Sequence, residues 1–539
     1  MNKKDQRLNI ILNRYCITGL LKTVSPLHIG SGTNRYITAF SSDSNTPKEV
    51  PVRAVPTDYN NKPYIPGASL RGILRAITEN MANSQFINDL WGISKNDSGE
   101  ADNEAVGGKV IVHDAYFSTE TKLKDTPLFE KGERHWNPER WTYIQHACAI
   151  NRFTKTAAEH QLFYEEVIPP GSLFEINIDI KDNDRKGLEL ILLALESFSK
   201  ENNIMPIGGD KSSGYGQCIW LKDRAKITGL ESKNDIQQWL QSNNACGFQG
   251  FPTIEIKSSN NFKPYDSKAI SIEMILTFDG PMVINDPTIW QLAEKSKDSS
   301  KSATNVNPIH NEKKKPFIPA QSLKGVIRTQ AERILRTIAE NCQPGLSAND
   351  LKKIACYPTQ KMLACKPLET KTELCIACTL FGASGWLSPI CIHDLDLIND
   401  AREITQEFVA IDRFTGGGAD QKKYSAKVLY KPVFKGLFSI NLTQEFEQVK
   451  ITDAHLGLLM LLFRDLFEKH IRLGYGTSKG YGSCGINFNC TSENIPEINK
   501  YDSKILADAF SLNWTNNVRE HIVQWVQALE IKINDKLKG

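Results

Sequence analysis

The chain has 539 residues, of which 40% are hydrophobic, 24% charged and 9% aromatic, and its formal net charge is +3. This composition excludes a disordered or fibrous chain and is typical of a folded protein with about two to four domains. The longest apolar runs resemble residues 456–463, which fall far short of the roughly 20 apolar residues that cross a membrane. The charged start has a broken apolar stretch, so we expect no secretory signal and a cytoplasmic protein.

Hydrophobic patterning predicts an ordered series of strands and helices in the first part of the chain. In chain order we expect a strand, a helix, two strands, a helix and a strand at 11–20, 69–81, 109–117, 172–180, 186–199 and 213–221. In the second of these helices Leu188, Leu192 and Leu195 share one face, as expected for an amphipathic helix.

The second part of the chain repeats the first. Matching segments recur in the same order as pairs, at 64–75 and 317–328, 90–92 and 380–382, 110–114 and 390–394, 149–154 and 410–415, 171–177 and 436–441, and 214–216 and 480–482. The same elements are therefore expected at 270–278, 322–339, 388–396, 436–443, 453–468 and 481–489. A repeat of this length indicates two copies of one domain.

The order β-α-β-β-α-β predicts an α+β protein with two tandem ferredoxin-like (RRM-like) domains. Each would have an antiparallel sheet with helices on one face, which leaves the other face free for a ligand. We expect the first domain at 1–222, a polar linker with some helix at 223–267, the second domain at 268–490 and a helical tail at 491–539. The amphipathic end of the tail is interpreted as a packing or docking helix.

Each copy places basic residues at the start of its first helix. The predicted N-caps and the basic residues after them are Ser69, Arg71 and Arg75 in the first copy and Ser322, Lys324 and Arg328 in the second. The two basic residues of each copy are four positions apart and share a face. Because a helix start offers free N–H groups and a positive dipole end, the pattern predicts a phosphate site, with an ordinary solvated basic face as the alternative.

A glycine-rich segment precedes the last strand of each copy, at 207–216 and 473–482. Glycine lets a backbone approach a phosphate closely, and each segment also carries a lysine. Lys211 with Gly214, and Lys479 with Gly480, are therefore candidate phosphate contacts, although a tight turn explains the glycines equally well. Neither segment is a Walker A loop, since the required strand–loop–helix context is missing.

Two further repeated features carry polar side chains. Arg152 and Arg413 precede polar segments at 154–163 and 415–429, which are expected to form exposed hairpins or plain surface loops. The His-Asp pairs at 113–114 and 393–394 suggest acid–base or metal chemistry. Adjacent residues of a strand point to opposite faces, however, so a structural role is favoured for these pairs.

Four cysteines of the second copy lie close together in sequence, at Cys356, Cys365, Cys375 and Cys378. The Cys375-x-x-Cys378 pair is half of a zinc knuckle, and the first copy lacks it. The spacing predicts a structural Zn²⁺, because four thiolates leave no open position for catalysis. Free buried thiols are the alternative, and Cys342 or Cys391 could replace one ligand.

In combination, the helix-opening Ile-Pro-Gly-Ala-Ser-Leu-Arg-Gly, the Asn/Asp-Arg-Phe-Thr segment and the late Gly-Tyr-Gly segment resemble the RAMP superfamily of CRISPR-associated proteins. The chain is most similar to the backbone subunits of type III effector complexes, and its tandem organisation looks like the fused subunits of type III-D and III-E systems. A structural zinc site also recurs in related type III-E proteins, and the resemblance carries it onto the four cysteines.

This resemblance implies that the chain binds CRISPR RNA beside other type III effector subunits and has no membrane partner. Residues 154–163 and 415–429 would be the thumbs, hairpins that displace a guide nucleotide at regular intervals. The RNA contacts implied for the repeated residues are Ser69, Arg71, Arg75, Arg152, Lys211, Gly214, Ser322, Lys324, Arg328, Arg413, Lys479 and Gly480.

Many type III members also cut the bound single-stranded target RNA, using an Asp on the loop after the first strand and a divalent metal such as Mg²⁺. Such a metal ion stabilises the charge that develops at the scissile phosphate. The two loops differ in sequence, so the repeat places no acid. Asp43 and Asp298 lie in the middle of their loops and are the first candidates, followed by Glu49 and Asp286.

Two other functions stay open from the sequence. The chain could be a non-catalytic scaffold whose sister subunits cut, or a nuclease that processes precursor CRISPR RNA without metal. Processing in that family usually relies on a catalytic histidine, and His28 is the histidine nearest the first loop. We expect His28 to pack or to contact backbone instead.

Overall fold

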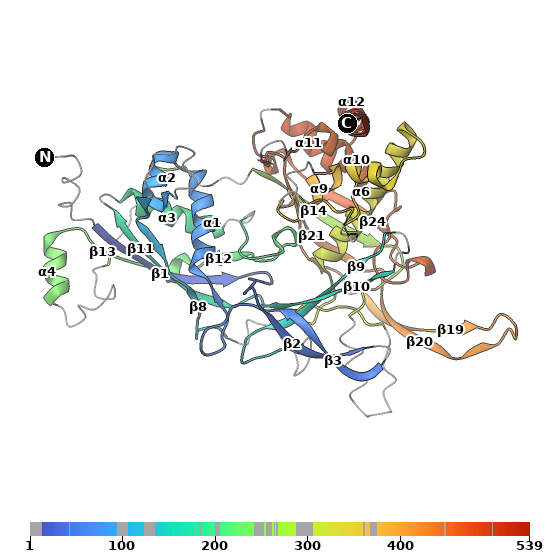
Figure 1. Cartoon of the computed structure of the whole chain (residues 1–539), viewed down its shortest axis with the longest axis horizontal. Helices are drawn as coiled ribbons and strands as arrows, with labels where there is room; N and C mark the ends of the chain where they lie inside the picture. Colours follow the sequence, from blue (N-terminus) through green and yellow to red (C-terminus); the bar gives the residue numbers. More distant parts are fainter. Residues whose placement is uncertain are drawn as a thin grey trace.

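The structure is a computed structural model, shown in Figure 1. It describes residues 13–538 apart from 42–43, 94–105, 123–134, 153, 155, 183–184, 200–204, 242–252, 255–260, 264, 266–267, 287–305, 359, 361, 367–373, 447–448 and 499. Among the described residues, no helix is both long and apolar enough to cross a bilayer.

The first copy is built on an antiparallel sheet around β1 (Asn13–Thr23), which pairs along its length with β11 (Leu173–Asp182). The remaining strands of this sheet are β4 (Tyr64–Ile65), β7 (Val110–Val112), β8 (Ala115–Phe117), β12 (Cys218–Trp220) and β13 (Lys226–Leu230). Tyr15, Ile17 and Leu21 alternate along β1 and are fully buried, so one face of the strand enters the core. The helices on this face are α1 (Gly67–Glu79), α2 (Ser84–Trp91) and α3 (Lys186–Glu196), as Figure 1 shows.

The second copy repeats this arrangement around β14 (Ala269–Phe278), which pairs with β21 (Val433–Asn441). Its other strands are β16 (Phe317–Ile318), β17 (Ile390–Ile392), β18 (Leu395–Leu397) and β24 (Cys484–Asn489). The helices are α6 (Ala320–Cys342), α7 (Ala348–Ile354), α9 (Ile376–Phe381) and α10 (Asp453–Phe467). The predicted α+β class and the order of elements in both copies are therefore confirmed, with boundaries shifted by a few residues.

Two smaller sheets leave the main sheets as hairpins. The first joins β2 (Asn34–Ser41), β3 (Ser44–Arg53), β10 (Ala157–Val167) and β9 (Tyr143–Ile150). The second joins β15 (Pro281–Met282), β20 (Gly418–Tyr430) and β19 (Arg402–Ile411). In Figure 1 the strands β9 and β10 reach from the first copy to the second, whereas β19 and β20 project from the second copy into open space.

The segment predicted as a linker, 223–267, contains the expected helix, α4 (Lys233–Gln241), and also β13, which the sequence did not predict. β13 pairs with the free edge of β1, from Lys226 opposite Thr18 to Leu230 opposite Arg14. The start of this segment therefore belongs to the first sheet.

Short elements elsewhere are β5 (Gly92–Ile93), β6 (Val106–Gly107), β22 (Glu445–Phe446), β23 (Val449–Lys450), and the 3-10 turns η4 (Ser197–Ser199), η5 (Lys211–Ser213), η6 (Lys222–Arg224), η8 (Thr477–Lys479) and η9 (Ser492–Asn494).

The tail forms α11 (Ser503–Phe510) and α12 (Asn516–Lys538), and α12 packs on α10 of the second copy. The buried residues of α12 recur at helical spacing and lie on one side of the helix, at Val518, Ile522, Trp525, Leu529 and Ile533. The two helices approach so closely that a Cβ at Gly457 of α10 would overlap the Trp525 carbonyl. The tail is thus part of the core of the second copy, in line with its interpretation as a packing helix.

Candidate functional site

The start of the first helix in each copy is capped by a carboxylate from a distant strand end. Asp114 accepts a hydrogen bond from the N–H of Gly67 at 2.7 Å, and Asp394 accepts one from the N–H of Ala320 at 2.7 Å. The predicted N-caps Ser69 and Ser322 are wrong, because the N-cap positions are Pro66 and Pro319. The aspartates of the repeated His-Asp pairs therefore have a structural role, as was favoured. Each carboxylate thus occupies one of the free N–H groups at this positive dipole end.

Several predicted RNA contacts are already engaged within the protein. Arg71 donates to the Trp91 carbonyl and lies over the Trp91 ring, and Arg75 pairs with Glu79 at 2.9 Å. Burial lowers the pKa of Lys324 to about 8. Arg328 and Arg152 both form ion pairs with the carboxylate of Glu332. These contacts within the chain occupy part of the hydrogen-bonding capacity of the basic residues, which stay predicted RNA contacts.

The glycine-rich segment of the first copy packs against the second copy. A Cβ at Gly214, whose φ is +77°, would lie 3.0 Å from the His393 Cα. Cys391 of β17 donates through Sγ to the Lys211 carbonyl at 3.2 Å, and Gln321 donates to Asp210 at 3.2 Å. Gly214 therefore serves the contact between the copies.

The equivalent segment of the second copy is open. A Cβ at Gly480 would have no atom within 4 Å, and Lys479 is exposed. The Lys479 ammonium lies 4.6 Å from the ring centre of Tyr424 and 4.9 Å from that of Phe408. The two rings are stacked, with centres 4.9 Å apart. Sequence reasoning missed this aromatic platform, of the kind on which nucleic-acid bases stack.

A groove of about 730 Å³ lies between the copies. From the first copy it is lined by the exposed side of α1 and by the glycine-rich segment, and from the second by β17 and β21. Lining residues with polar groups or an open backbone include Ser69, Gly72, Lys211, Ser388 and His393. Ser69 and Lys211, which are far apart in the sequence, both line this groove.

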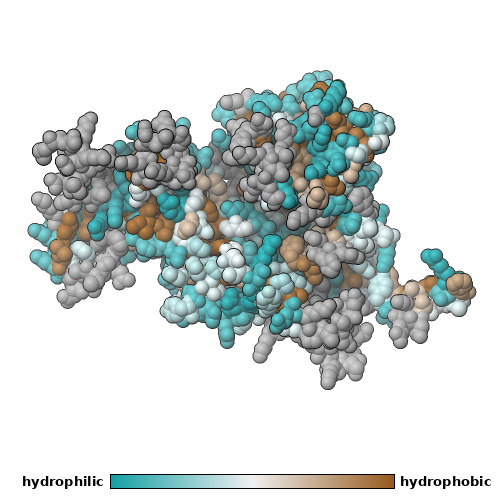
Figure 2. Space-filling view, viewed as in Figure 1, coloured by the Kyte–Doolittle hydropathy of each residue, from teal (hydrophilic) through white to brown (hydrophobic). Residues whose placement is uncertain are grey.

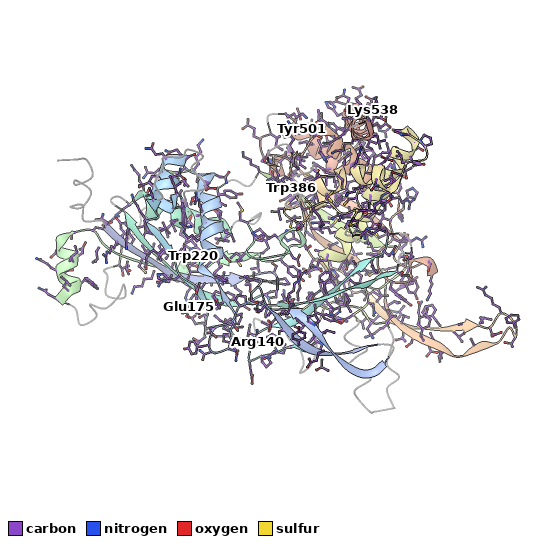
Figure 3. All side chains as sticks on the ribbon, viewed as in Figure 1. Arg140, Glu175, Trp220, Trp386, Tyr501 and Lys538 are labelled. Atoms are coloured by element: carbon purple, nitrogen blue, oxygen red, sulfur yellow. The ribbon has the colours of Figure 1, made fainter. Side chains whose placement is uncertain are left out.

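His28 lies next to residues that line this groove and is held by hydrogen bonds to the backbone. Its Nδ1 is 2.8 Å from the Glu166 carbonyl of β10, and its own carbonyl accepts the Gly209 N–H at 2.8 Å. Glu166 is fully buried and is bound by Arg35 and by Arg140, which is labelled in Figure 3. Burial acts to raise the pKa of Glu166, but these hydrogen bonds outweigh it and hold the pKa below its usual value. His28 therefore contacts backbone, as expected.

The two predicted thumbs differ in their surroundings. The β19–β20 hairpin projects from the second copy, and Figure 2 shows apolar residues on it in brown. At its tip Phe414 is 99% exposed, Ile411 is also exposed, and so is Arg413. The β9–β10 hairpin instead contacts the second copy through Arg152, whose Nε lies 3.0 Å from Glu332 of α6.

The structure places only part of the predicted catalytic set. Asp43 and Asp298 lie outside the described residues. Glu49 is exposed on β3, opposite Thr38 of β2. Asp286 is buried between the copies, with a carboxylate oxygen 3.9 Å from Nε2 of His146 on β9.

The four cysteines form a compact cluster, with all sulfur atoms within 4.8 Å of one another. A tetrahedral zinc ion with Zn–S bonds of about 2.3 Å sets its sulfur atoms about 3.8 Å apart, so the cluster fits such an ion. The N–H of Cys378 donates to Cys375 Sγ at 3.3 Å, and that of Cys375 donates to Cys365 Sγ at 3.4 Å. Hydrogen bonds of this kind favour thiolates.

The alternative ligands are placed elsewhere. Cys342 is exposed at the end of α6, and Cys391 is engaged with Lys211. Within the described residues, the only cluster of His, Cys, Asp and Glu able to hold a metal ion is that of Cys356, Cys365, Cys375 and Cys378.

Comparison with known proteins agrees with this architecture. The model of the RAMP superfamily matches residues 20–219 and 275–485, most of both copies, and the chain belongs to this superfamily. It is also similar to the CRISPR system Cms endoribonuclease Csm3 of Streptococcus thermophilus, with 24% identity over 222 residues. The alignment covers 39% of this chain and 88% of that protein. The chain is therefore a RAMP protein related to a type III CRISPR subunit.

The carboxylate caps generate a prediction. Asp114→Ala should destabilise the first copy by about 1 kcal/mol, because the Gly67 N–H loses its acceptor. Asp114→Asn is the control, since an amide oxygen can still accept this bond. Thermal unfolding of the two variants should separate them, and equal melting temperatures for Asp114→Ala and the unmodified chain would contradict the capping role.

Proposed function

We propose that this chain is a CRISPR RNA-binding backbone subunit of a type III effector complex, built from RAMP domains at 1–222 and 268–490. The observation that carries the proposal is the groove between the two copies, where Ser69 and Lys211 line one surface. Open glycine positions let a phosphate backbone approach closely, and a lysine supplies charge. The name of the Csm3 relative, an endoribonuclease of a CRISPR system, supports RNA as the ligand.

In this proposal the RNA follows the groove and the exposed part of the second copy. Arg413 at the hairpin tip and Lys479 on the aromatic platform contact the phosphates or bases there, with Gly480 admitting the backbone. Arg152, Arg328 and Gly214 hold the protein together instead. Arg71, Arg75, Ser322 and Lys324 remain secondary candidates, because contacts within the chain already engage or bury most of them.

The groove can be tested by placing a charge in it. Gly72 is exposed in α1, and a Cβ there has no atom within 4 Å, so a larger side chain fits. Gly72→Glu should weaken the binding of a fluorescent single-stranded RNA at least about tenfold, because like charges repel across an interface. Gly72→Gln introduces a side chain of the same size without the charge, so this variant should bind the RNA more tightly than Gly72→Glu does. Equal affinities in an anisotropy titration would refute the groove as the RNA path.

For catalysis we infer that loop carboxylates hold a divalent cation such as Mg²⁺ and that the chain cuts single-stranded target RNA paired with the guide. RNA supplies its own 2′-hydroxyl nucleophile, so the protein needs to align it and to neutralise the phosphate. The non-catalytic scaffold is the alternative that the same experiment tests.

We expect Asp43→Ala to erase one cut in the target RNA and Asp298→Ala another, with target binding unchanged in both. The measurement is a map of cuts made by the assembled complex with complementary RNA and Mg²⁺. If all cuts persist, Glu49 and Asp286 are the next residues to replace. A complex that still cuts normally without any of the four acids would leave this chain as a scaffold.

For the cysteine cluster we infer a structural Zn²⁺, supported by the compact arrangement of four sulfur atoms. Protein purified without chelator should contain about one zinc ion per chain by elemental analysis. Replacing Cys375 and Cys378 by Ser should remove the zinc and destabilise the second copy. Cys342→Ser is the matched control, since this cysteine is exposed and lies outside the cluster, and it should keep the metal. Zinc-free protein would contradict the assignment.

A further inference from the structure

A buried carboxylate stands at the junction of the two copies. Glu332 of α6 has no exposed surface and lies beside three arginines. Its carboxylate oxygens are 2.9 Å from Arg328 Nε, 3.0 Å from Arg152 Nε and 3.8 Å from Arg336 Nη2. The side chains of these arginines are only 14–17% exposed, so the ion pairs are largely shielded from solvent.

Two of these arginines also reach the cysteine cluster. Arg328 donates through Nη2 to Cys378 Sγ at 3.2 Å and through Nη1 to the Gly382 carbonyl, just beyond α9, at 3.1 Å. Arg336 donates to the carbonyl of Cys356 at 2.9 Å. Because Arg328, Glu332 and Arg336 are successively four residues apart, one face of α6 presents them all to the cluster.

The third arginine comes from the other copy. Arg152 follows β9, at the end of the β9–β10 hairpin, and its Nη1 also donates to the Ile150 carbonyl at 2.8 Å. The guanidinium thus ties the turn of this hairpin to Glu332. A continuous chain of hydrogen bonds runs from Cys378 through Arg328, Glu332 and Arg152 to the first copy.

The charges of this chain of contacts complement those of a metal-bound cluster. Three guanidinium groups and one carboxylate have a net charge of +2 in a shielded place. A divalent ion held by four thiolates has a charge of −2, which neutralises them. Without the ion, the four sulfur atoms are no longer held in place by a common partner, so Arg328 loses the fixed acceptor that Cys378 Sγ provides. Outer partners of this kind commonly orient metal ligands in proteins.

The first copy serves as an internal comparison. By the repeat, Arg75 and Glu79 occupy the places of Arg328 and Glu332 and are likewise 2.9 Å apart. Their side chains are 27% and 49% exposed, and the first copy lacks the cysteines. The buried version of the pair thus occurs in the copy that has the cluster and receives Arg152.

We propose that metal binding at Cys356, Cys365, Cys375 and Cys378 locks the β9–β10 hairpin of the first copy onto the second copy through Arg328, Glu332 and Arg152. This proposal rests on the inferred metal occupancy and is independent of the RNA function. The cluster then controls the geometry of the junction between the copies, beyond holding its own segment together.

Hydrogen–deuterium exchange of the full chain, with and without its zinc, tests the proposal. Removing the metal with a chelator should speed exchange in peptides covering 143–152 by about threefold or more, because the turn loses its anchor. In Arg152→Leu these peptides should exchange fast even with zinc bound, and metal removal should add nothing. Elemental analysis should find the zinc content of Arg152→Leu unchanged, since this residue is not a ligand.

Arg53→Leu is the matched control. Arg53 pairs with the buried Glu165 of β10 at 2.8 Å, in the same small sheet but away from α6. This variant should keep the response of residues 143–152 to metal. A hairpin that ignores metal removal in the unmodified chain, or an Arg152→Leu variant that responds as the unmodified chain does, would overturn the proposal. A chain that binds no metal refutes the metal centre itself, whereas bound metal with an unresponsive hairpin refutes only this connection.

Discussion

The contact between the two copies is the interaction on which the rest of the structure depends. The glycine-rich segment of the first copy lies against β17 of the second, and Gly214 is small enough to meet the His393 backbone. This contact places lining residues of both copies around one groove. Because of this contact, the repeated His-Asp pairs of the two copies lie in different environments. His113 is 44% exposed and bonds Asp179, whereas burial lowers the pKa of its counterpart His393.

The elements of each copy could be predicted because hydrophobic period and turn residues are local properties of a sequence. The cysteine cluster could be predicted for the same reason, since the two-residue spacing of Cys375 and Cys378 is a local signal of a metal site. The helix caps could not, because Asp114 reaches Gly67 across 47 positions, and only the fold brings them together. Nor could the repeat distinguish Arg152 from Arg413. The burial of one and the exposure of the other follow from tertiary packing, on which a shared motif carries no information.

Strand β13 is a further feature that tertiary structure determines, in this case through backbone hydrogen bonds. Its residues Lys226–Leu230 include a glycine and few apolar side chains, so their pattern does not predict a strand. The free edge of β1 supplies the missing reason, because its unpaired N–H and C=O groups need partners. An edge can thus recruit a segment whose own preference is weak, and reading the segment alone cannot reveal it.

Because β13 anchors the connecting segment to the first sheet, the tether between the two copies begins at Leu230 and ends at Ala269, where β14 starts. Tethering of this kind typically raises the effective concentration of two partners to about the millimolar range. The junction between the copies therefore forms as an intramolecular step, whatever the amount of protein in solution. The one-to-one ratio of the two copies is fixed by covalent connection, and a substitution that weakens the junction loosens the two copies without separating them.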